Sequence, residues 1–136
     1  MTAIEAWYLG NGPDSLRSVE DVIALVGKVR ADSLASGAPL LMSWYLDDDD
    51  DTPEFGVGVN GAVGIVSYTG RQWPGLWVSR GGDQADTEVM SYDYMGNERP
   101  VFVSAEIPYA DVVRAATEFF RNGGDRPASV AWQKLA

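Results

Sequence analysis

The chain has 136 residues, a length that suits a single domain and can bury a hydrophobic core without disulfides. It contains no cysteine and no histidine, which excludes thiolate and serine–histidine catalysis and removes the most frequent metal ligand. Its net charge of −10 predicts repulsion from nucleic acids and anionic membranes, and attraction to basic partners.

The first third of the sequence predicts a strand, a helix and a second strand. Side-chain alternation indicates a strand over 3–9. Ser18 and Asp21 form a helix-capping pattern, and the apolar residues that follow recur at helical spacing, so we expect a helix over about 18–35. The segment 39–46 is apolar on both sides, which is typical of a central strand.

The stretch EFGVGVNGAVGIVSYT, residues 54–69, has the clearest local pattern in the chain. Asn60 and Gly61 lie between two strand-like runs and predict a tight type I′ turn of a β-hairpin. In that register Val59 would face Ala62.

The two faces of this hairpin differ in side-chain size. Gly56 and Gly58 would lie opposite Ile65 and Val63 on one face, which predicts that another element packs closely against the glycines. The other face would be apolar throughout, with Phe55, Val57, Val59, Val66 and Tyr68.

The remaining sequence predicts more strands and one more helix. Pro108 suits the first turn of a helix over about 108–122, and Gly123 and Gly124 suit its end. Short connections favour antiparallel neighbours. We therefore expect an α+β fold in one domain, residues 1–136, with a single mostly antiparallel sheet of about six to eight strands and two helices packed on one face. The further strands are predicted at 75–79, 87–94, 101–106 and 127–133.

The N-terminus lacks the basic and apolar regions of a signal peptide. No apolar stretch reaches the roughly 18 residues of a membrane-spanning segment. We therefore expect a soluble, cytoplasmic protein.

Five consecutive aspartates, residues 47–51, follow the apolar strand 39–46. A metal site, a solvated turn and an acidic surface for a basic partner are the three interpretations of this run. A calcium loop fits worst, because the run has no glycine and its ligand spacing is wrong. No metal and no other cofactor is predicted.

Two further groups of residues carry candidate functions. The segment RQWPGLWVSRGG, residues 71–82, places two tryptophans between arginines, a composition typical of protein interfaces. Trp73 is its candidate for exposure, whereas we expect Trp44, Trp77 and Trp132 in the core. In the strand 87–94, Tyr92, Asp93 and Tyr94 are candidates for lining a cleft, although alternation in a half-exposed strand explains them equally well.

The C-terminal segment IPYADVVRAATEFFRNGGDRPASVAW, residues 107–132, combines a helix with an arginine-alanine step, an aromatic pair, a Gly-Gly-x-Arg-Pro turn and a final Val-x-Trp. This layout resembles the Imm-one family of immunity proteins, which belong to bacterial polymorphic toxin systems and are widespread in actinobacteria. The hairpin 55–68 and the segment 88–108 are similar to the same family, whereas the N-terminal half matches only in outline.

The resemblance implies a non-enzymatic protein that binds a cognate toxin domain, often a nuclease or a deaminase, and occludes its active site. An acidic surface fits a toxin that itself binds nucleic acid. The alternative is a small-molecule-binding or carboxylate-dependent enzymatic domain recruited to a biosynthetic pathway, with Tyr92, Asp93 and Tyr94 in its cleft. The candidate partner-binding residues of the first hypothesis are Asp47, Asp48, Asp49, Asp50, Asp51, Glu54, Trp73 and Arg80.

Overall fold

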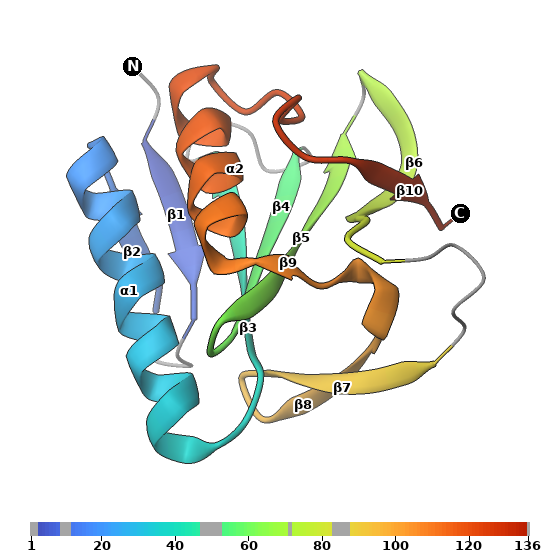
Figure 1. Ribbon diagram of the computed structural model, residues 1–136. Helices are drawn as coiled ribbons and strands as arrows, with labels where there is room; N and C mark the ends of the chain where they lie inside the picture. The colour runs from blue at the N-terminus through green and yellow to red at the C-terminus, as the bar shows by residue number, and fades with distance from the viewer. Residues whose placement is uncertain (1–2, 9–11, 47–52, 71, 83–87, 136) are drawn as a thin grey trace.

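The computed structural model describes residues 3–8, 12–46, 53–70, 72–82 and 88–135 (Figure 1). The aspartate run 47–51 lies outside the described residues. The elements in chain order are β1 (Ile4–Trp7), β2 (Asp14–Leu16), α1 (Val19–Ser36), β3 (Leu40–Leu46), β4 (Glu54–Asn60), β5 (Val63–Gly70), β6 (Trp73–Ser79), β7 (Val89–Tyr94), β8 (Asn97–Phe102), a 3-10 turn (Val103–Ala105), β9 (Ile107–Pro108), α2 (Tyr109–Arg121) and β10 (Trp132–Lys134).

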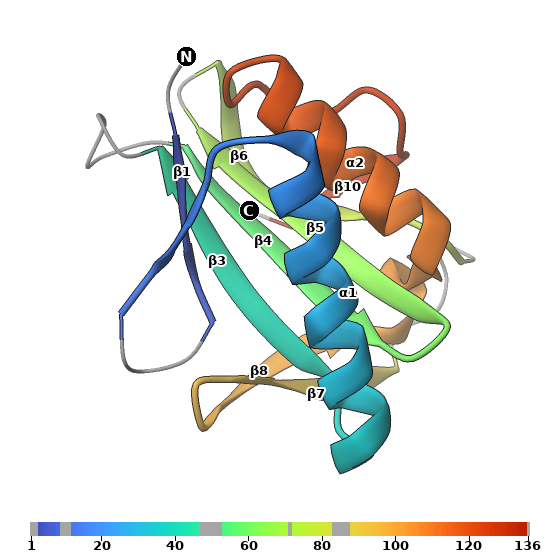
Figure 2. The ribbon, with the colours of Figure 1, turned by 90° about the vertical axis from the view of Figure 1, so that its left-hand side faces the viewer.

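One sheet contains all ten strands of the described chain, with the main order β10-β6-β5-β4-β3-β1-β2. The β7–β8 hairpin joins β3, and β9 joins β5. Every pair is antiparallel except the single parallel bridge between Leu40 and Asp93. Both helices cross the same face of β3, β4 and β5 (Figure 2). The predicted α+β class is confirmed.

The number of strands is larger than predicted. The two unpredicted strands are β2, with three residues, and β9, with two. Strands this short do not contain a repeat of side-chain alternation, so the sequence pattern cannot reveal them. Their pairing with β1 and β5 is what defines them.

The strand predicted at 101–106 was misplaced. The segment MGNERP, residues 95–100, predicts a turn, but only its first two residues form one; Asn97–Phe102 is β8, and residues 103–105 form the 3-10 turn. The true turn is Met95–Gly96, where both residues have positive φ, 49° and 88°, as a type I′ hairpin turn requires. Pro100 is tolerated because β8 pairs on one edge only within the described sheet.

Helix α1 begins and ends where the sequence predicts. The Ser18 side chain accepts a hydrogen bond from the Asp21 N–H at 3.1 Å, as expected from the capping pattern. Gly37 follows the helix with φ of 70° and donates its N–H to the Ser33 carbonyl. A glycine in this left-handed conformation closes the helix without steric cost.

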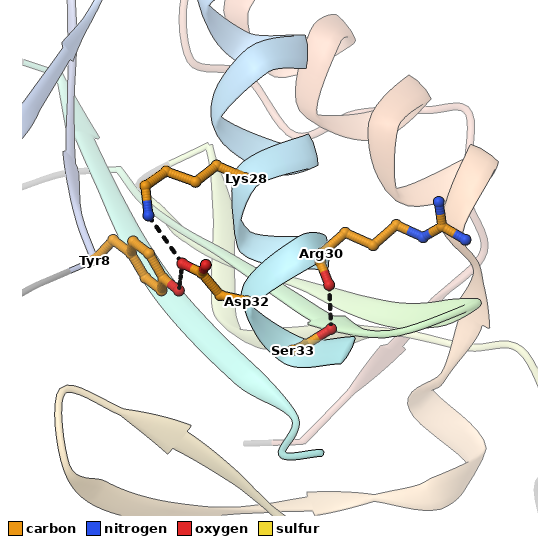
Figure 3. Close-up of polar contacts among 5 residues, drawn as sticks. All are labelled: Tyr8, Lys28, Arg30, Asp32 and Ser33. Atoms are coloured by element: carbon orange, nitrogen blue, oxygen red, sulfur yellow. Dashed lines mark hydrogen bonds and ion pairs between the residues drawn. The ribbon is translucent and has the colours of Figure 1, made fainter. Parts of the chain in front are cut away.

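Polar contacts fix α1 against its neighbours (Figure 3). The Tyr8 hydroxyl, just after β1, donates to Asp32 at 2.7 Å, and Lys28 contacts the same carboxylate at 2.9 Å. These hydrogen bonds, that from Tyr8 first, hold the pKa of Asp32 below its usual range. The Ser33 hydroxyl donates to the Arg30 carbonyl at 2.8 Å, one turn back in the helix.

The β4–β5 hairpin is confirmed, but its turn lies one residue later than predicted. Asn60 pairs with Val63, so the turn residues are Gly61 and Ala62, and Gly61 has a φ of 63°. Contacts from α1 hold Gly61 in place: its N–H donates to the Ser33 hydroxyl at 3.1 Å and its carbonyl accepts from Arg30 at 3.0 Å. A local sequence pattern cannot reveal either contact, which is why the predicted turn was one residue early.

The register change moves each cross-strand partner by two residues and therefore leaves the faces unchanged. The apolar face of the hairpin packs under the helices, where Phe55 stacks on Phe119 with ring centroids 4.3 Å apart. On the opposite face Gly58 lies across from Ile65, and a Cβ atom at Gly58 would meet the Tyr92 ring at 2.8 Å. The predicted close packing against this glycine is thus confirmed, and β7 supplies it.

Two hydrophobic cores therefore lie on opposite sides of the sheet. The larger one, between the sheet and the helices, contains the fully buried Trp44, and Trp77 and Trp132 pack against it partly buried. The smaller one lies beneath the β7–β8 hairpin and is built from Ile65, Val78, Tyr92 and Ala105. Neither helix of the described chain has the length and apolar composition needed to cross a membrane.

Candidate functional site

The face of the sheet opposite the helices carries a cleft of about 610 Å³. The cleft runs across β3, β4, β5 and β6, and the β7–β8 hairpin forms one of its walls. Odd-numbered residues of β3 line it, while their even-numbered neighbours are buried under the helices. Its apolar lining includes Leu41, Ile65, Leu76, Val78, Val101 and Leu135.

Polar side chains gather where β3 and β4 meet at one end of the cleft. Tyr45 and Glu54 are cross-strand partners, and the buried Ser43 donates its hydroxyl to the Glu54 carboxylate at 3.3 Å. Burial raises the pKa of the Tyr45 hydroxyl, and the nearby Glu54 and Tyr94 raise it further. Glu54 itself is exposed. An exposed carboxylate beside two phenols is suited to bind a cation.

The hairpin wall contributes Tyr94 and Arg99 to the same cleft. The Arg99 guanidinium lies 5.1 Å from the centre of the Tyr94 ring, within the range of a cation–π contact. The cleft therefore has an acidic group on its floor and a basic group on its wall.

Of the three residues predicted for a cleft, Tyr94 lines it and the other two lie elsewhere. Tyr92 is fully buried, and its hydroxyl donates to Glu106 at 2.7 Å. Asp93 is exposed, and its carboxylate accepts the Gly96 N–H at 2.8 Å in the turn after β7. Strand alternation turns Asp93 away from this face of the sheet. Tyr92 and Tyr94 share the face, where Tyr92 is buried in the small core and Tyr94 lines the cleft.

Glu106 organises a partly buried hydrogen-bond network that the sequence did not indicate. Besides Tyr92 it accepts a hydrogen bond from the Asn60 side chain at 3.0 Å. Burial raises the pKa of the Tyr92 hydroxyl, and the bond to Glu106 and its charge raise it further. The network connects the β4–β5 turn, β7 and the segment before α2, so it fixes the hairpin wall of the cleft.

The candidate partner-binding residues do not form one patch in the described structure. Glu54 lines the cleft. Trp73 on β6 is 40 % exposed and contacts the Trp77 ring. Trp77 pairs across the strands with Tyr68, which belongs to the core under the helices. Arg80 is exposed just after β6, where its backbone N–H donates to the Ala131 carbonyl at 2.9 Å.

Trp73 also belongs to a cage of three tryptophans around Arg126. The guanidinium lies 3.8 Å from the Trp73 ring centre, 4.6 Å from that of Trp77 and 5.4 Å from that of Trp132. Burial lowers the pKa of Arg126. The cage attaches the Gly-Gly-x-Arg-Pro turn and the last strand to the edge of the sheet, which gives these motif residues a structural role.

No group of three or more acidic side chains within the described ranges is placed to hold a metal ion. In a comparison with known protein families, the model of a family described as "Immunity protein Imm1" matches residues 10–134, nearly the whole chain. No curated protein matches the sequence significantly.

Proposed function

Since this chain belongs to the Imm1 family of immunity proteins, we propose that it is a non-enzymatic inhibitor that binds a cognate toxin domain and occludes the toxin's active site. The observation that carries the proposal is the extent of the family match, residues 10–134. A match of this extent includes both helices and every described strand except β1, so it concerns nearly the whole fold and not a shared motif.

The charge of the chain favours a basic, nucleic-acid-directed toxin. The net charge is −10, and the five carboxylates of the run 47–51 precede Glu54, which lines the cleft, by only three to seven positions in the sequence. A toxin that binds nucleic acid presents a basic groove for phosphates, and an acidic inhibitor competes for it. Charge pairing of this kind mainly raises the association rate and the specificity. In this proposal the toxin contacts the aspartate run, Glu54, Trp73 and Arg80.

The function is tested by searching the neighbouring genes for a toxin domain and producing that domain together with this chain. Co-expression of this chain should restore growth to a bacterial host that produces the toxin, and the two proteins should co-purify as a complex. A host that dies in the presence of folded, abundant chain would refute the immunity function.

The role of the aspartate run is tested by the association rate at low and high ionic strength. Replacing Asp48–Asp50 by asparagine should slow association several-fold at low salt and flatten its salt dependence. The matched control removes the same charge from exposed positions on β2, α1 and β8, through Asp14→Asn, Glu20→Gln and Glu98→Gln. Equal rates for the two triple variants would mean that only net charge acts and that the run is a solvated turn.

The cleft supports a second candidate, a small-molecule-binding domain recruited to a biosynthetic pathway. Its volume of about 610 Å³ lies within the range of ligand pockets, and Tyr45, Glu54 and Tyr94 converge at one end. An enzymatic version is less well supported, because the carboxylate in the cleft is exposed and its neighbours are phenols and a serine. Native mass spectrometry of the chain purified from its own host should reveal a retained small molecule under this hypothesis and none under immunity.

A further inference from the structure

The cleft extends across the strands of the sheet and not along them. Its lining extends from Tyr45 on β3 to Leu135 just beyond β10, which are five neighbouring strands in the sheet. With roughly 4.8 Å between neighbours, this corresponds to a groove of about 19 Å. An extended peptide rises about 3.3 Å per residue, so five or six residues match the groove.

The two ends of the groove differ in chemistry. The apolar end, towards β6 and β10, is lined by Leu76, Val78 and Leu135. The other end has Glu54 beside Tyr45, and the Ser43 hydroxyl orients the Glu54 carboxylate from the buried side. A bound peptide would contact both ends if it carried an apolar side chain and a cationic side chain separated by at most five or six residues.

We infer that this groove docks an extended segment of the toxin, with an aliphatic side chain on the apolar floor and an arginine or lysine at Glu54. The inference rests on the proposed immunity function and adds the surface and the chemistry of the bound segment. Charge complementarity supports it, because the chain carries a net charge of −10 and a cationic segment is attracted to the groove over a distance. The Arg99 contact with Tyr94 shows that a phenol ring at this end accepts a guanidinium on its face.

The inference is tested with three acetylated, amidated pentapeptides of the sequence Leu-Ser-Leu-Ser-X, where X is arginine, citrulline or glutamate. Citrulline keeps the shape of arginine and removes its charge. Titration of the isotope-labelled chain by NMR should shift the amide signals of Tyr45, Ser67 and Val78. The arginine peptide should bind about threefold to fivefold more tightly than the citrulline peptide, the upper part of the range expected for an exposed ion pair.

Two variants and one control locate the charge contact. Glu54→Gln should abolish the preference for arginine over citrulline. Glu98→Gln should preserve it, because Glu98 is an exposed carboxylate of the hairpin that does not line the cleft. Arg99→Ala should leave arginine binding unchanged or tighten it within about twofold, since it removes a like charge.

Several results would overturn the inference. Equal affinity for the arginine and citrulline peptides, shifts confined to other surfaces, or no binding at millimolar peptide would each exclude a cation-binding peptide groove. Preference for the glutamate peptide, lost in Arg99→Ala, would mean that the cleft takes an anion instead. A retained small molecule that displaces the peptides would assign the cleft to the second candidate function.

The toxin itself separates this inference from the proposed function. If the wild-type chain protects the host and Glu54→Gln has the same affinity for the toxin as Glu98→Gln, the groove inference fails and immunity stands. If the wild-type chain does not protect, the immunity function fails whatever the peptides show.

Discussion

Replacing Tyr92 by phenylalanine should destabilise the protein by about 2 kcal/mol, because a hydrogen bond from a buried hydroxyl to a carboxylate contributes about 1.5–3 kcal/mol. The Tyr92 ring is fully buried, and its hydroxyl donates to Glu106 at 2.7 Å. Phenylalanine keeps the ring that packs on Gly58 and removes the donor only. Glu106 retains the hydrogen bond from Asn60 at 3.0 Å, so the carboxylate is not left without a partner and the loss stays in the lower part of that range.

Urea unfolding measures the loss. The midpoint should fall by about 1 M with an unchanged slope, because the surface exposed on unfolding is nearly the same. Tyr94→Phe is the matched control: Tyr94 lies two residues along the same strand, half-buried at the cleft, and its replacement should cost less than about 0.5 kcal/mol. A loss below about 0.5 kcal/mol for Tyr92→Phe, or equal losses for both variants, would refute the role of the Glu106 network.

Three further predictions concern the cores and the pH dependence of stability. Phe120 is 5 % exposed, so Phe120→Ala should lower the free energy of unfolding by about 3–5 kcal/mol, and a calorimetric loss under 1 kcal/mol would place the ring outside the core. Gly58→Ala should lower the free energy of unfolding by about 1–3 kcal/mol through overpacking, because the new Cβ atom would lie 2.8 Å from the Tyr92 ring. Gly27→Ala in α1 should raise it by about 0.5–1 kcal/mol, because the new Cβ atom would lie 3.9 Å from its nearest neighbour. Stability changes of the same sign for both variants would contradict this packing. Burial, and after it a hydrogen-bonded carboxylate, raises the pKa of the Tyr92 and Tyr8 hydroxyls, so the folded state holds these protons more tightly than the unfolded state does. The free energy of unfolding should therefore be highest below about pH 10 and fall as the pH rises above about 10. A urea midpoint that stays constant from about pH 8 to 11 would contradict this.

The sequence alone determined the features that depend on neighbouring residues. The Ser18 cap and Gly37 set the bounds of α1, since both act on backbone groups within one helical turn. Alternation along β4 and β5 assigned the buried face of the hairpin, because side chains on a strand point to opposite sides with a period of two. The small residue Gly58 indicated that another element packs closely on it, and that element proved to be β7.

Only the tertiary structure decided the features that join distant segments. The tryptophan cage around Arg126 brings together β6, the turn after α2 and the last strand, and no periodicity relates these positions. The cleft likewise exists because β3, β4, β5 and β6 pair in register and the β7–β8 hairpin folds over their uncovered face. The β4–β5 turn is held at Gly61 by hydrogen bonds with Ser33 and Arg30 of α1, which the local sequence 54–69 cannot reveal. The physical reason is common to all three: the energy of each arrangement comes from packing and hydrogen bonds between segments that the chain brings together only when the whole sheet has formed.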